Sequence, residues 1–74
     1  MDHYEEIIKR FEYLGELHHE VAELLELLPD PRHAASDHAL AEAEERSAET
    51  CRRVATSIRT RLKLRVPGAD DLAS

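Results

Sequence analysis

His18 and Glu44 are the residues of this 74-residue chain whose types and placement most suggest chemistry. His18 lies within a run of apolar residues spaced three and four apart, a position that faces a partner helix. If the chain reverses direction near residue 30, equal rise per residue aligns residues whose numbers add to about 62, and His18 lies level with Glu44. The pair is either a hydrogen-bonded layer that fixes helix pairing or, doubled by a second chain, a ligand set for iron, zinc or manganese.

A second spacing, Glu16-x-x-His19, places a carboxylate and an imidazole one helical turn apart. It resembles the Glu-x-x-His element of the ferritin-like di-iron bundles. The resemblance implies a metal centre to which Glu16 and His19 contribute beside His18 and Glu44. In the expected register Glu16 and His19 point away from the other helix, so this centre requires a larger assembly.

The chain also contains two Glu-x-x-Glu elements, Glu20 with Glu23 and Glu42 with Glu45. They resemble the magnesium-binding signature of the all-α nucleoside triphosphate pyrophosphohydrolases of the MazG type. The resemblance implies carboxylates that gather Mg²⁺ and activate a water. The second element departs from the family pattern, because Glu45 stands where Asp is usual.

Other spacings predict ordinary structural roles rather than catalysis. His19 with Glu23 and His38 with Glu42 are spaced i to i+4, which is typical of solvated contacts along one helix. Cys51 is expected to be a buried, unreactive thiol. With two glycines in the chain, a phosphate-binding loop is excluded. We therefore expect a non-enzymatic protein without a cofactor.

Heptad patterns predict two long helices that carry these residues. Large residues follow the a and d positions of the first half: Tyr4, Ile7, Phe11, Leu14, His18, Val21, Leu25 and Leu28. Small residues recur in the second half, with a few larger ones: Ala34, Ala41, Ala48, Cys51, Ala55, Ile58 and Leu62. Large side chains against small ones pack without voids, so we expect Phe11 opposite Cys51 and Leu14 opposite Ala48. The expected fold class is all-α, a two-helix antiparallel hairpin.

Capping signals set the expected boundaries. Asp2 caps the first helix, and Asp30 followed by Pro31 is an N-cap and first-turn pair for the second. Pro67 and Gly68 stop the second helix. The single domain at 1–66 therefore comprises helix 2–28, turn 29–31 and helix 31–66, followed by a short acidic tail at 67–74.

Apolar residues beyond the expected helix contact predict self-association. Two hairpins packed face to face would bury them in a four-helix bundle. The residues expected at this interface are Leu17, Leu24, Leu40 and Val54. The shape resembles the plasmid copy-number regulator Rop, in architecture alone. We expect a homodimer that acts as an assembly or regulatory module and contacts another protein.

Composition and charge indicate the expected cell compartment and the expected class of partner. A net charge of −6, one Cys and the absence of a long apolar run favour a cytoplasmic protein without a membrane span. One segment is basic and contains Arg52, Arg53, Arg59, Arg61, Lys63 and Arg65. In the antiparallel register it lies beside Asp2, Glu5 and Glu6, which would neutralise it. The net negative charge of the chain and its few aromatic residues argue against nucleic acid as the partner.

Overall fold

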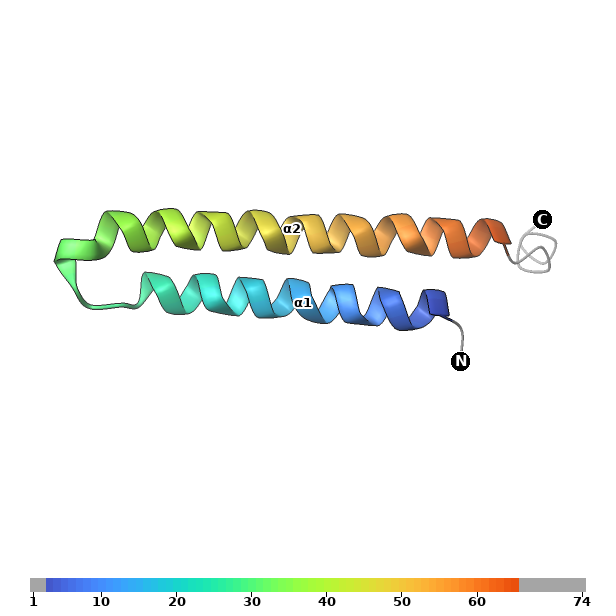
Figure 1. Ribbon diagram of the computed structural model, residues 1–74, viewed down its shortest axis with the longest axis horizontal. Coiled ribbons are helices and arrows are strands. Elements are labelled where there is room, and N and C mark those ends of the chain that lie inside the picture. The colour runs from blue at the N-terminus through green and yellow to red at the C-terminus, as the bar shows by residue number, and fades with distance from the viewer. Residues whose placement is uncertain (1–2, 66–74) are drawn as a thin grey trace.

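The chain folds as two long antiparallel helices packed side by side (Figure 1). The computed structural model describes residues 3–65, without the side chain of Arg65. Helix α1 spans His3–Glu26, a short 3₁₀ turn η1 spans Pro31–His33, and helix α2 spans Ala34–Arg65. The expected all-α hairpin is confirmed within these residues, and the predicted tail at 67–74 lies outside them. Neither described helix has an apolar stretch long enough to cross a membrane.

The connection between the helices is longer than the expected turn at 29–31. Helix α1 ends at Glu26, two residues before the expected end at Leu28. Pro29 explains this difference, because proline disfavours the helical conformation in the residue before it. The amides of Leu27 and Leu28 bond three residues back, at 3.1 and 3.3 Å, and close the helix with a tight last turn.

Asp30 and Pro31 begin the second half of the hairpin as predicted. An Asp30 carboxylate oxygen accepts a hydrogen bond from the Arg32 amide at 3.0 Å, and Pro31 occupies the first position, where its missing amide costs nothing. The capped segment is one 3₁₀ turn, so the α-helix begins at Ala34 rather than at residue 31. The cap predicted at Asp2 lies outside the described residues.

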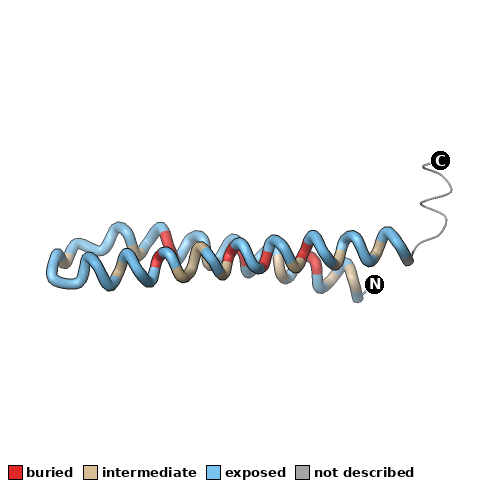
Figure 2. Tube along the Cα trace, turned by 90° about the horizontal axis from the view of Figure 1, so that it is seen from above, coloured by how far each residue is buried: buried red, intermediate tan, exposed pale blue. Residues whose placement is uncertain are grey.

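Small residues form the contact between α1 and α2. Buried positions follow a narrow line along both helices (Figure 2) and are Ile8, Gly15, Ala22, Ala41, Ala48, Cys51 and Ala55. A Cβ atom added to Gly15 would lie 3.4 Å from the Ala48 carbonyl oxygen and 3.5 Å from the Cys51 Cβ. The two backbones therefore approach closely at this level of the hairpin.

The face of α1 that packs on α2 differs from the expected one. The a residues of the predicted heptad, such as Phe11, are half-buried, but the d residues are exposed by 40 to 52%: Ile7, Leu14, Val21 and Leu28. Residues one position further along replace them: Ile8, Gly15 and Ala22. The predicted packing of Leu14 on Ala48 is wrong, because Gly15 brings the backbones too close to leave room for a large side chain between them.

The helix contact divides the hairpin into two unlike sides. One side, here called the apolar face, carries exposed large residues: Ile7, Leu14, Leu17, Val21, Leu24 and Leu40. The opposite, polar side carries pairs that join the two helices: Glu12 with Arg59, His19 with Glu45, and Glu26 with His38. Of the residues expected at a dimer interface, Leu17, Leu24 and Leu40 belong to the apolar face, whereas Val54 is half-buried.

Substitution of Gly15 tests the close contact. A single Cβ meets its neighbours at van der Waals distance, so Gly15→Ala should raise the free energy of unfolding by about 0.5–1 kcal/mol through the higher helix propensity of Ala. Gly15→Leu overfills the same space and should lower it by about 1–3 kcal/mol. Urea denaturation followed by circular dichroism, at one protein concentration, measures both changes. Equal stability of the two variants would contradict the contact.

Candidate functional site

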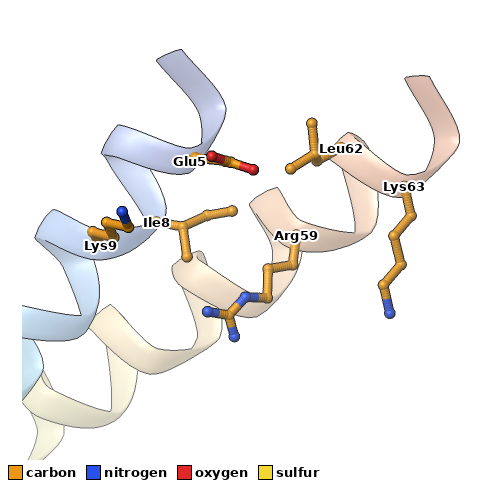
Figure 3. Close-up of a pocket in the computed structure, with 6 residues that line it drawn as sticks. All are labelled: Glu5, Ile8, Lys9, Arg59, Leu62 and Lys63. Atoms are coloured by element: carbon orange, nitrogen blue, oxygen red, sulfur yellow. The ribbon is translucent and has the colours of Figure 1, made fainter. Parts of the chain in front are cut away.

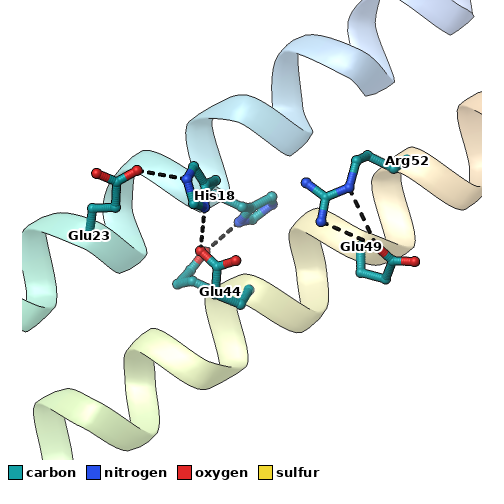
Figure 4. Close-up of polar contacts among 7 residues, drawn as sticks. His18, Glu23, Glu44, Glu49 and Arg52 are labelled. Carbon is teal, nitrogen blue, oxygen red and sulfur yellow. Dashed lines mark hydrogen bonds and ion pairs between the residues drawn. The ribbon is translucent and has the colours of Figure 1, made fainter.

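His18 and Glu44 meet across the two helices, as the register predicts (Figure 4). The His18 Nδ1 atom is hydrogen-bonded to a carboxylate oxygen of Glu44. Both side chains are half-buried, with 35% and 32% of their surface exposed. On α1 this pair lies one turn from Leu14 and from Val21, so a polar contact is placed among the large residues of the apolar face.

His19, the next residue, lies on the polar side between two glutamates. Its Nδ1 donates to the Glu45 carboxylate of α2 at 2.6 Å, and its Nε2 lies 2.6 Å from the Glu23 carboxylate one turn along α1. A carboxylate only accepts hydrogen bonds, so both ring nitrogens must carry a proton to make both contacts. The geometry therefore fits a positively charged imidazolium.

His38 of α2 has the same arrangement in reverse. Its Nδ1 donates to Glu26 of α1 at 2.7 Å, and its Nε2 lies 2.7 Å from Glu42 on its own helix. The spacing His-x₃-Glu-x₂-Glu occurs in both helices, at residues 19–26 and 38–45. In the antiparallel hairpin, the last Glu of each copy reaches the His of the other. These two groups are called here the histidine clusters.

The partners across the hairpin were missed by reasoning from single helices. The i to i+4 spacing of His19 with Glu23 and of His38 with Glu42 predicts contacts along each helix, and the structure contains them. Glu45 and Glu26 complete the histidine clusters from the other helix. The repeated His-x₃-Glu-x₂-Glu spacing is the signal that could have revealed them.

Electrostatics favour the charged form of both histidines. The hydrogen bond and the charge of Glu45, with a smaller contribution from Glu23, raise the pKa of His19 above its ordinary value. Glu26 and then Glu42 raise the pKa of His38 in the same way. The clusters therefore hold the hairpin most strongly when both imidazoles are protonated.

The four residues expected as metal ligands do not converge within one chain. His18 and Glu44 form one pair, His19 belongs to a histidine cluster, and Glu16 is exposed on α1. Among residues 3–65, no group of three or more His, Cys, Asp or Glu side chains is arranged to hold a metal ion. The structure brings together one pair of the expected set.

Comparison with known proteins offers no relative whose role could be transferred. The chain matches no family model, no curated protein and no solved structure. Its function must therefore follow from the contacts, burial and charge of its own residues.

The two Glu-x-x-Glu elements act mainly as partners of histidine. Glu23 and Glu45 contact His19, and Glu42 contacts His38. The remaining carboxylate, that of Glu20, is exposed on α1. Three of the four carboxylates in these elements therefore contact imidazoles on the polar side of the hairpin.

Ion pairs neutralise part of the basic segment. Arg59 reaches across to Glu12 of α1 at 2.8 Å. Arg52 and Arg53 share Glu49 of their own helix at 3.1 and 3.2 Å, and these bonds lower the pKa of the Glu49 carboxyl. Of the acids expected beside this segment, Glu5 lines a hollow together with Arg59 and Lys63, Glu6 pairs with Arg10 of its own helix, and Asp2 lies outside the described residues.

Cations remain exposed at the open end of the hairpin, opposite the turn. Arg61 and Lys63 are exposed, and Glu6 pairs with Arg10 of its own helix at 2.8 Å. A shallow hollow of about 380 Å³ opens between the helices there (Figure 3), lined by Glu5, Ile8, Lys9, Arg59, Leu62 and Lys63. Three of its six lining residues are basic, so this end attracts negative charge.

The histidine clusters predict a pH dependence of stability with a defined sign. Because the folded-state pKa values of His19 and His38 are raised, the stabilisation is complete below the ordinary histidine pKa and is lost as pH rises through the raised values. The melting temperature should therefore fall between about pH 6 and pH 8.

Circular dichroism melts across this range measure the effect. His19→Gln with His38→Gln should flatten the pH profile, because glutamine carries no titrating proton. His3→Gln, at an exposed position at the start of α1, is the control and should retain the wild-type slope. A melting temperature that rises with pH in the wild-type protein would show the sign to be wrong.

Proposed function

We propose that this protein is a non-enzymatic interaction module that pairs with a second copy of itself in a four-helix bundle. The paired form would then serve the assembly or regulation of another protein. The supporting observation is the distribution of side-chain size. Small residues fill the helix contact, and large apolar residues remain outside it on the apolar face.

The large residues of the apolar face are costly for an isolated hairpin to leave in water. Leu17, Leu24 and Leu40 are exposed by 37%, 63% and 54%. Full burial of one such side chain contributes about 1.5–3 kcal/mol. Contiguous exposed apolar residues typically mark a protein interaction site. A second hairpin offers a matching face, because the same residues are present on it.

His18 and Glu44 would act as the specificity layer of this bundle. A polar pair among large apolar residues lowers stability but penalises helix registers that separate its two members. The pair is already formed within each hairpin, so two copies can associate without separating its members. We also propose a cytoplasmic location, since the buried free thiol of Cys51 suits a reducing compartment.

One observation supports a second candidate, a metal-binding bundle. His18 and Glu44 touch in each chain and lie among the apolar-face residues, so pairing about an axis near them would gather two imidazoles and two carboxylates. Iron, zinc and manganese bind such a donor set. Metal content therefore belongs in any test of the oligomer.

Charge introduced on the apolar face should prevent pairing. Leu17→Glu with Leu24→Glu would place two carboxylates in the buried interface and should weaken the dimer by about 100-fold or more. Native mass spectrometry of protein purified without chelator reports subunit count and bound metal together. The matched control, Ala35→Glu with Ala39→Glu, adds the same charge at exposed positions of α2 away from the apolar face and should remain dimeric. A wild-type monomer would refute the proposal.

Removal of the polar pair should raise stability while lowering the specificity for one oligomeric state. His18→Leu with Glu44→Leu replaces a polar contact by apolar packing and should raise the melting temperature by a few degrees, roughly the effect of 1 kcal/mol in a small domain. The same variant should populate more than one oligomeric state in native mass spectra. A lower melting temperature together with loss of stoichiometric metal would instead support the metal-binding candidate.

A further inference from the structure

We infer that the second copy packs with its turn over the open end of the first, so that the two turns lie at opposite ends of the bundle. This inference rests on the proposed self-association. The evidence is the uneven distribution of charge along the hairpin, which distinguishes this arrangement from the one that places both turns at the same end.

The hairpin is an electric dipole along its length. Gly15 lies against Ala48, so residues 15–48 form the half that contains the turn. That half contains nine acidic and two basic residues, a formal charge of −7 with histidines counted as neutral, and it remains acidic at −5 when His19 and His38 are protonated. The open half, residues 3–14 and 49–65, contains four acidic and eight basic residues, a formal charge of +4.

The same division occurs at the heptad positions of the apolar face. In the open half, Arg10 repeats the position of Leu17 on α1, and Arg61 repeats the position of Leu40 on α2. In the turn half, Asp37 and Glu44 occupy one heptad position on α2, about one helical turn on either side of Leu40. Basic residues therefore border this face at one end, and acidic residues border or enter it at the other.

Symmetry permits two ways to stack the apolar faces of two hairpins. With the turns at opposite ends, α1 packs on α1 and α2 packs on α2, and the open half of each copy lies over the turn half of its partner. With the turns at the same end, α1 of each copy packs on α2 of the other, and like halves meet. Packed helices lie about 8–10 Å apart, close to the screening length at physiological salt. Charges on the two copies therefore interact across the interface, and they favour the arrangement in which unlike halves meet.

Distances between spin labels distinguish the two arrangements. Ser36→Cys, near the turn and exposed, would carry the label on a Cys51→Ala background. In the opposite-end dimer the two labels should lie about 40 Å apart, because they flank the middle of two antiparallel α2 helices. In the same-end dimer they should lie about 20 Å apart.

A reciprocal sample guards against a misplaced label. One copy labelled at Ser36 is mixed with another labelled at Thr60, an exposed residue near the other end of α2. Unlike copies should add a short distance to the long one in the opposite-end dimer, and a long distance to the short one in the same-end dimer. The distance that appears only on mixing is therefore short in one arrangement and long in the other.

Each outcome has one meaning. A long Ser36 distance with a short mixed distance supports the inference. A dimer with the reverse order overturns the inference and leaves the proposed function intact. A monomeric mass for the unlabelled protein overturns the proposed function and, with it, the inference.

Charge reversal tests the physical cause. Arg53→Glu, Arg61→Glu and Lys63→Glu together change the formal charge of the open half from +4 to −2. The dimer should then weaken by about tenfold at low salt, with a smaller loss at high salt, and a same-end population should appear. The control Arg53→Lys, Arg61→Lys and Lys63→Arg preserves charge and should behave as wild type. Unchanged affinity and label distances in the reversed variant would refute the electrostatic basis.

Discussion

The close approach of two helix backbones is the constraint on which the rest of the structure depends. Gly15 packs against the Ala48 carbonyl and the Cys51 side chain, and alanines recur along the same line. No side chain larger than Ile8 fits fully within this contact among the described residues. The large residues of α1 must therefore lie beside the contact, where they form the apolar face. The size of the buried residues thus decides which surface the hairpin presents to other molecules.

The same constraint explains what could be predicted from the sequence. The level of each residue along the hairpin depends on the rise per residue and the turn, so the pairing of His18 with Glu44 is predictable. The rotation of α1 about its own axis is not predictable, because two lines of residues along this helix fit the heptad pattern equally well. One passes through Phe11 and Leu14, and the other through Phe11 and Gly15. Only the fit of small residues against α2 selects the second.

The polar side shows a second limit of reasoning from single helices. The spacing of His19 with Glu23 and of His38 with Glu42 is visible within each helix. Glu45 and Glu26 become partners only when the chain reverses, because they come from the opposite helix. Their arrangement gives the hairpin an approximate internal two-fold symmetry on this side, although the apolar face has no such symmetry. One side therefore closes the hairpin upon itself, whereas the other remains open to association.

The small residues between the helices also limit how much free energy of folding one chain gains by burying apolar surface. An interior of glycine and alanine with Ile8 and Cys51 removes little apolar area from water within one chain. In the proposed dimer a second molecule buries the large side chains of the apolar face, so folding and association would become one concentration-dependent event. The abundance of the protein would then set how much of it is helical. A chain that pairs in the proposed way would sense its own concentration, since it would gain its ordered shape only above a threshold amount.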